Sequence, residues 1–271
     1  MDVNKVLYIT QEIAPYVPET ALGAFARNIS QSTQENGAEV RTFMPKYGNI
    51  NERRNQLHEV IRLSGINIPI DDNDHPLLIK VATLQPSRLQ VYFIDSDDFF
   101  MRNASGLLDT EHDAESNDER SIFFVRGTAE TVKKLRWEPS VVHCIGWISS
   151  LAPLYLRTVF ADDPVFVNTK IVFTLIGKGF DNNLNAEMVR KLKADGFTDE
   201  QLGALADGVD HDALARLAMD YADAITIGSD DVSPQLVEYA RATGKPLLEY
   251  SADTTPQQYM ELYKSLLHNN R

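Results

Sequence analysis

The stretch that decides the fold runs from residue 6 to residue 44 and reads VLYITQEIAPYVPETALGAFARNISQSTQENGAEVRTFM. Residues 6–10 form a short apolar run, which is typical of a buried parallel strand. Apolar side chains recur at helical spacing over residues 21–36, and Gly37 suits the end of that helix. A second apolar run follows at 40–44. The pattern predicts a strand–helix–strand unit whose first loop lies at the usual ligand-binding edge of a sheet.

The remainder of the chain continues this alternation of strands and helices. We therefore predict an α/β fold, a single Rossmann-like doubly wound parallel sheet in one domain that spans residues 1–271. The expected strands are 58–63, 66–70, a hairpin of 77–83 with 89–94, 141–144, 170–175 and 224–227. The expected helices are 121–135, 149–159, 183–195, 199–206, 212–222, 233–243 and 256–267, with a polar surface loop at 103–119.

The charge balance argues against a nucleic-acid-binding protein. The chain has 26 lysines and arginines against 39 aspartates and glutamates, a formal net charge of −13. Proteins that bind nucleic acids concentrate basic side chains to neutralise phosphates, and this surface would repel a polyanion. Hydrophobic residues make up 43% of the chain, which suffices for a full core and excludes a mainly disordered protein.

Other sequence features indicate no export signal, membrane span, disulfide or metal site. Cys144 is the one cysteine and has no partner for an internal disulfide. The first residues lack the basic start and long apolar core of a signal peptide, and no window approaches the roughly 18 apolar residues of a membrane span. His112, His211 and His268 have no partners at metal-ligand spacing. We expect a cytoplasmic protein without metal or cofactor and without a membrane partner.

A series of short motifs carries a family resemblance. Glu12, Pro15 and Leu22 match the pattern S-E-x-x-P followed by K-x-G-G-L after a first strand. Residues 44–50 (MPKYGNI) and 91–95 (VYFID) match later motifs in the same order, as do the segments 119–120, 137–139, 142–144, 161–164, 172–174 and 221–223. This collinear series, over about residues 5–240, resembles bacterial glycogen and starch synthases, retaining glucosyltransferases of the GT-B architecture.

The resemblance implies the N-terminal half of a two-domain enzyme. A GT-B enzyme has two Rossmann-like domains facing across a cleft, and the C-terminal domain holds most of the sugar-nucleotide donor. We expect that donor-binding domain to be absent here. Residues 255–268 resemble the terminal helix of full-length relatives, which crosses back onto the N-terminal domain. Its apolar side chains Tyr259, Leu262, Tyr263 and Leu266 form one stripe, which predicts docking on the body of the domain.

The sequence departs from the family at three cleft motifs. Pro18-Glu19-Thr20-Ala21-Leu22 replaces K-x-G-G-L, which leaves either a changed ligand site or an ordinary turn capped by Thr20. Ile145 and Gly146 replace the histidine and aspartate of H-C-H-D-W, and His143 reads as a core residue. Ile176 replaces a histidine that binds the glucosyl group in the family. The candidate ligand cleft comprises Glu12, Tyr16, Thr20, Ala21, Gly23, Ile145, Gly146, Gly177, Lys178 and Gly179.

Two interpretations of single cleft features stay open. Gly177-Lys178-Gly179 is either an anion-binding loop or a flexible turn with a solvated lysine. Glu12 either faces the cleft or anchors the loop. We also expect apolar loop residues of the cleft face, Tyr16, Val17 and Ile176, to be uncovered and to favour a homo-oligomer or a partner protein.

Two classes of function follow from these observations. The departures favour a catalytically degenerate relative, a binding or regulatory protein for a sugar nucleotide or an α-glucan, with no catalytic residue assigned. The alternative is an active half that transfers glucose from ADP-glucose to an α-1,4-glucan with a donor domain from a partner chain. The family's residues that stabilise charge on the leaving diphosphate are replaced here, which favours the first class.

Overall fold

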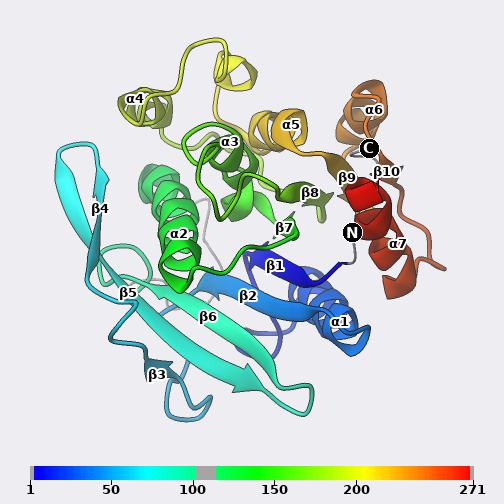
Figure 1. The fold of residues 1–271 in the computed structure, drawn as a ribbon. Coiled ribbons are helices and arrows are strands. Elements are labelled where there is room, and N and C mark those ends of the chain that lie inside the picture. Colours follow the sequence, from blue (N-terminus) through cyan, green and yellow to red (C-terminus); the bar gives the residue numbers. More distant parts are fainter. Residues whose placement is uncertain (1–2, 102–113, 269–271) are drawn as a thin grey trace.

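The computed structural model describes residues 3–101 and 114–268, and in these residues the chain forms a ten-stranded sheet (Figure 1). The strand order is β10-β9-β8-β7-β1-β2-β6-β5-β3, and β4 pairs with β5. The strands are β1 (Lys5–Thr10), β2 (Glu39–Pro45), β3 (His58–Glu59), β4 (Ile66–Ile70), β5 (Asn73–Leu84), β6 (Leu89–Asp95), β7 (Val141–Ile145), β8 (Lys170–Leu175), β9 (Ala224–Ile227) and β10 (Leu247–Leu248).

Helices cover both faces of this sheet. Figure 1 shows α2, α3 and α5 on one side and α1 with α7 on the other, where α1 and α7 are in contact. The helices are α1 (Ala21–Glu35), α2 (Ala114–Leu135), α3 (Ala152–Arg157), α4 (Glu187–Ala194), α5 (His211–Tyr221), α6 (Pro234–Ala242) and α7 (Pro256–His268). Two 3₁₀ turns occur at Trp147–Ser149 and Gly203–Leu205.

The central strands are parallel and buried on both faces. Every residue of β7 is buried, and in β1 and β8 only the first residue is half-exposed. Such strands read as continuous apolar runs because helices cover both of their faces. The expected doubly wound α/β architecture is therefore confirmed for β10 through β6.

One edge of the sheet is antiparallel, so the sheet is mixed rather than wholly parallel. Strands β5 and β6 pair antiparallel, from Leu78 opposite Asp95 to Leu84 opposite Leu89. The hairpin expected for this region is confirmed. A connection of four residues permits only an antiparallel pair, because parallel neighbours need a long crossover.

Several expected boundaries were wrong. Helix α2 begins at Ala114 rather than 121, so residues 114–119 are helical, and the rest of the expected loop at 103–113 lies outside the described residues. The sequence did not indicate the first turns of α2 because they lack an apolar pattern. Asp118 is buried there by an ion pair with Lys191 on α4 rather than by apolar packing. The helix expected at 149–159 is shorter, and Pro153 lies in the first turn of α3.

Helix α7 lies along α1 and buries one face. Tyr259, Met260, Tyr263, Leu266 and Leu267 are buried, and the ring of Tyr259 meets that of Phe25 on α1 edge-on at 5.7 Å. In the part of the chain that the structure describes, no helix is both long and apolar enough to cross a membrane.

Candidate functional site

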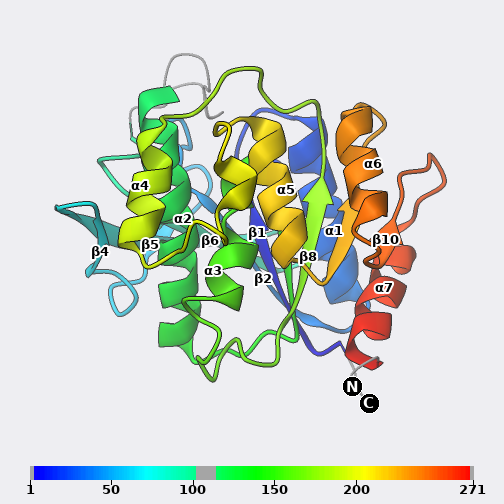
Figure 2. The same ribbon diagram turned by 90° about the horizontal axis from the view of Figure 1, so that it is seen from above.

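A pocket of about 300 Å³ lies at the carboxyl ends of β1, β7 and β8. In Figure 2 this edge of the sheet is at the top, where the β8 arrow ends. The loops that follow the three strands and the start of α5 form its wall. Its lining residues are Gln11, Glu12, Leu22, Gly146, Trp147, Ile176, Gly177, Lys178, Gly179, Phe180 and His211.

The pocket brings together half of the sequence-predicted candidates. Glu12, Gly146, Gly177, Lys178 and Gly179 line it directly. The other five lie nearby or in the core: Thr20 caps α1, Ala21 is exposed at the start of α1, and Tyr16, Gly23 and Ile145 are buried.

Glu12 is held beside the N-terminus of α1. The Thr20 hydroxyl donates to Oε2 of Glu12 at 2.6 Å and accepts from the Gly23 amide at 2.9 Å. Nε2 of Gln11 donates to the other carboxylate oxygen at 3.2 Å. Only 2% of Glu12 is exposed, and this burial raises the pKa of its carboxyl above the ordinary value. The carboxylate therefore both anchors the loop and lines the pocket.

Gly23 and Gly146 permit this close approach of the loops. A Cβ on Gly23 would lie 3.1 Å from the Thr20 hydroxyl, so a side chain there would crowd the cap. Gly146 has a φ of +84°, and its Cβ would lie 2.9 Å from Cβ of Gln11. Oε1 of Gln11 is buried without a hydrogen-bond partner. The pocket wall thus holds an acceptor that a donor can satisfy.

The loop after β8 supplies a basic side chain. Gly177 and Gly179 both have positive φ, at +75° and +77°, and Lys178 between them is exposed. The Gly177 amide already donates to the Ser229 hydroxyl at 2.8 Å. Among the described residues that line the pocket, Lys178 is the one lysine or arginine. The loop therefore offers one exposed cation, and the Gly177 amide is not free to bind a ligand.

Three ring side chains of the wall were not predicted from sequence. The rings of Trp147 and Phe180 meet edge-on at 5.4 Å, and those of Phe180 and His211 at 5.5 Å. His211 begins α5, whose N-cap Asp210 accepts from the Ala213 amide at 2.7 Å. That N-cap marks where α5 begins, and His211 at this start lines the pocket together with the loops after β1, β7 and β8. A Cβ on Gly179 would lie 2.3 Å from the His211 ring, so glycine is required there.

The comparisons with known proteins agree with this geometry. The family described as starch synthase catalytic domain matches residues 5–245. The chain belongs to this family. It is 36% identical over 237 residues to a glycogen synthase of Chlorobium phaeobacteroides and 37% identical over 232 residues to that of Chlorobium phaeovibrioides. The alignments cover 84% and 82% of this chain and 48% and 47% of those proteins, so the chain spans about half the length of these curated relatives.

Solved structures show the same fold. The catalytic domain of starch synthase IV from Arabidopsis thaliana, bound to ADP and acarbose, matches with a TM-score of 0.73 at 18% identity, over 92% of this chain and 51% of that one. A sucrose-phosphate synthase from Thermosynechococcus elongatus matches with a TM-score of 0.51 at 12% identity, over 97% of this chain and 99% of that one. The predicted resemblance to the starch synthase half-domain is confirmed.

Of the segment 143–147, Gly146 and Trp147 line the pocket, whereas His143 and Ile145 do not. Ile145 ends β7 fully buried, and His143 is fully buried two residues earlier. Nδ1 of His143 lies 2.6 Å from the Tyr263 hydroxyl, and Nε2 is hydrogen-bonded to Thr174. His143 is therefore a core residue with both ring nitrogens hydrogen-bonded, as the sequence predicts.

The expected exposure of Tyr16 and Val17 was wrong. Both are buried, with 7% and 5% of their surface exposed, and the Tyr16 ring packs edge-on against Phe93 at 4.9 Å. The loop after β1 folds back on itself, with the Ala14 amide donating to the Gly23 carbonyl. Its apolar side chains thereby cover the end of β6 instead of facing outward, and Ile176 is half-buried.

Proposed function

We propose that this member of the starch synthase family is catalytically degenerate and binds a neutral sugar, such as the end of an α-glucan, in the pocket at β1, β7 and β8. In this role it is a binding or regulatory protein and does not transfer glucose. The observation that carries the proposal is the Glu12–Thr20–Gly23 arrangement at the start of α1.

This arrangement disfavours a diphosphate. A helix N-terminus attracts anions through free amides and the helix dipole. Here the Gly23 amide is bound by the Thr20 hydroxyl, and the buried Glu12 carboxyl lies at the same place. A second negative group beside a buried carboxylate adds repulsion to a desolvation cost. The exposed Lys178 is a single cation against that charge.

The rest of the wall suits a sugar. Neutral sugar rings combine an apolar face with hydroxyl groups at the edge, and binding pockets pair aromatic walls with a few polar groups. Trp147 and Phe180 supply the aromatic wall, and Oε1 of Gln11 can accept a hydrogen bond from a sugar hydroxyl. The Arabidopsis relative was solved with ADP and acarbose, and we assign only the sugar part of such a pair to this chain.

The alternative is an active glucosyltransferase half that works with a donor domain. The specific observation in its favour is Lys178, a cation between two glycines of positive φ at the pocket wall. In that case the lysine would contact the diphosphate of ADP-glucose, and Glu12 would face the sugar.

Two measurements separate these functions. Purified protein is assayed for transfer of glucose from ADP-glucose to glycogen, and we expect no turnover above a blank without enzyme. Binding of maltotetraose and of ADP is then followed through the amide NMR signal of Gly179, with Gly37 as a remote control. We expect maltotetraose to move the Gly179 signal and ADP to leave it in place. Turnover that is lost in Lys178→Ala, or an ADP-induced shift without a maltotetraose shift, would contradict the proposal.

Restoring the family motif tests why this chain is expected not to bind a diphosphate. The variant Pro18→Lys/Thr20→Gly/Ala21→Gly rebuilds K-x-G-G at the start of α1 and removes the hydroxyl that occupies the Gly23 amide. We expect ADP binding to rise at least tenfold over the parent chain. Pro18→Lys alone, which adds the same charge but keeps the Thr20 hydroxyl on the Gly23 amide, is the matched control. An equal gain in both variants would show that charge alone accounts for the effect.

A further inference from the structure

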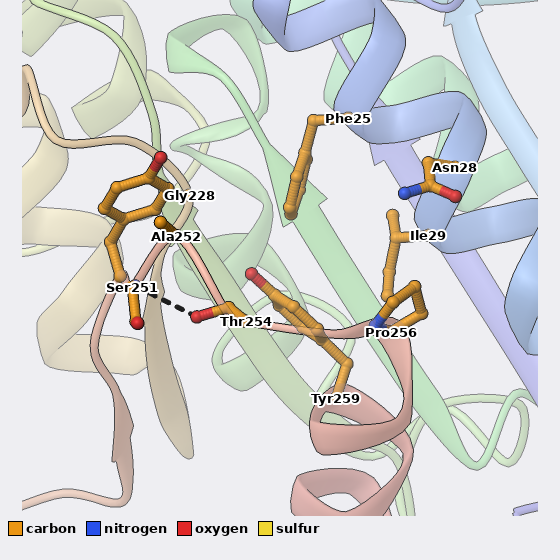
Figure 3. Close-up of a pocket in the computed structure, with 10 residues that line it drawn as sticks. Phe25, Asn28, Ile29, Gly228, Ser251, Ala252, Thr254, Pro256 and Tyr259 are labelled. Carbon is orange, nitrogen blue, oxygen red and sulfur yellow. Dashed lines mark hydrogen bonds between the residues drawn. The ribbon is translucent and has the colours of Figure 1, made fainter.

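A second pocket, of about 140 Å³, lies between α1, the end of β9 and the segment that leads into α7. Figure 3 shows Phe25 and Tyr259 projecting into it from the two helices, with Gly228 and the Ser251–Thr254 turn at its side. Residues of the pocket at β1, β7 and β8 do not recur in its wall.

Much of this wall lies outside the part of the chain that matches the starch synthase family. The family match ends at residue 245, whereas Tyr250, Ser251, Ala252, Thr254, Pro256 and Tyr259 follow it. Phe25, Asn28, Ile29 and Gly228 come from the matched part. The pocket is therefore formed jointly by the family fold and by the segment that closes this chain onto α1.

The aromatic geometry excludes a sandwiched planar ring. The rings of Phe25 and Tyr259 lie at 64° to each other with centroids 5.7 Å apart. A nucleobase stacked between two side chains needs parallel faces, and this pair leaves no such slot. The two rings instead form a corner, against which a puckered ring with an apolar face can rest. Tyr250, which is 42% exposed, also lines this pocket.

The polar groups of the wall are neutral. None of the ten lining residues carries a charge. The Thr254 hydroxyl accepts from the Ser251 amide at 3.0 Å, and the Ser251 hydroxyl accepts from the Asp253 amide at 3.3 Å, so both hydroxyl protons are available to donate. The amide side chain of Asn28 is exposed on the adjacent turn of α1. These groups suit hydroxyl partners and provide no counter-charge for an ion.

We propose that this α1–α7 pocket is a second binding site, which takes one neutral hexose ring of a free sugar or of a glucan chain. The apolar face of the ring rests in the Phe25–Tyr259 corner, and its hydroxyl groups bond to Asn28, Ser251 and Thr254. The site goes beyond the proposed function and does not rest on it, because its wall shares no residue with the other pocket.

The test follows each pocket separately by amide NMR of the full chain labelled with ¹⁵N-glycine and ¹⁵N-alanine. Ala252 reports on the α1–α7 pocket, and Gly179 reports on the pocket at β1, β7 and β8. Methyl α-glucoside and maltotetraose are titrated in turn, to separate a single ring from a glucan chain, with adenosine and glucose 1-phosphate as the planar and the charged comparison. We expect both neutral sugars to move the Ala252 signal, and the two comparison molecules to bind there at least tenfold more weakly.

Substitutions make the result specific. Tyr250→Ala and Asn28→Leu should each weaken the Ala252 response at least tenfold and leave the Gly179 response unchanged. Phe180→Ala should do the reverse, and Ile61→Ala, at a side chain 82% exposed, should change neither. An Ala252 signal that stays still with both sugars, or that responds as strongly in Tyr250→Ala and Asn28→Leu as in the parent chain, would overturn the second site. Loss of the Gly179 response alone would contradict only the proposed function.

Discussion

The hydroxyl of Tyr263 on α7 lies 2.6 Å from Nδ1 of His143 on β7, and both side chains are fully buried. The same hydroxyl lies 3.0 Å from that of Tyr8 on β1. On the other side of the imidazole, Thr174 is hydrogen-bonded to Nε2 and to the Thr226 hydroxyl at 2.6 Å. One polar network therefore fastens the last helix to four adjacent strands. Buried polar groups are costly unless partnered, so the network makes the position of α7 specific.

His143 predicts an acid dependence of stability. Burial lowers the pKa of its imidazole from 6.5 to about 3. Between these values the unfolded chain binds a proton that the folded chain does not, so the free energy of unfolding falls as pH falls, by about 1.4 kcal/mol per pH unit at most. The rings that face it, Tyr8, Tyr259 and Tyr263, stay neutral there because burial raises the pKa of each.

Urea unfolding at pH 7, 6, 5 and 4 measures this effect. We expect the free energy of unfolding of the parent chain to fall more steeply with acid than that of His143→Gln. His58→Gln, at an exposed histidine, should keep the parent slope. Equal slopes for the parent chain and His143→Gln would show that folding does not lower the pKa of His143.

Tyr263→Phe tests the network without removing the ring. The change leaves Nδ1 of His143 and the Tyr8 hydroxyl each short of one partner, although Tyr8 keeps Thr33 at 2.7 Å. An unsatisfied buried group costs about 1–3 kcal/mol, so we expect a loss of stability in that range in chemical denaturation. Tyr250→Phe, at an exposed tyrosine, should change stability little. A loss no larger than that of the control would mean that the hydrogen bond contributes nothing net.

Thr20 should contribute to stability through its hydroxyl. It caps α1 through the Gly23 amide and donates to the buried Glu12 carboxyl. Thr20→Ala removes both bonds, and loss of an N-cap alone costs about 0.5–2 kcal/mol. Thr20→Ser keeps the hydroxyl and should retain most of the stability. Thermal melts of the two variants measure the difference, and equal melting temperatures would contradict the cap assignment.

The central strands were predicted well because each is a continuous run of apolar residues in the sequence. The bounds of β8 and β9 were predicted to the residue, and those of α7 within one, since each has a clear period and clear ends. The start of α2 was missed because Asp118 is buried by an ion pair with Lys191, which lies far along the chain. A pattern within a short stretch of sequence cannot indicate an ion-pair partner that far away in the chain.

Strand ends in the sequence identified several loops that line the pocket at β1, β7 and β8, but not the segments that reach it from elsewhere in the chain. Gly146 follows β7 directly and Lys178 lies three residues after the end of β8, so both were predicted to lie at one edge. His211 reaches the same pocket from the start of α5, thirty-three residues after Lys178 in the sequence. Tyr16 shows the opposite error, because a loop residue after a strand folded inward onto Phe93.

Deletion of residues 254–271 tests whether α7 is part of the folded core. The deletion removes the buried side chains of α7 and leaves Tyr8 and His143 without the Tyr263 hydroxyl. Each buried side chain of this size contributes about 1.5–3 kcal/mol, against about 5–15 kcal/mol of net stability for a domain. We expect insoluble protein or a melting temperature lower by several degrees.

A point variant keeps the α7 prediction testable if the truncated chain does not fold. Leu266→Ala at the buried face should cost about 2–5 kcal/mol, whereas Lys264→Ala on the exposed face of the same helix should cost little. Thermal melts of the two variants compare faces of one helix at matched helix propensity. The same melting temperature for Leu266→Ala, Lys264→Ala and the parent chain would show that α7 is not docked on α1 in solution.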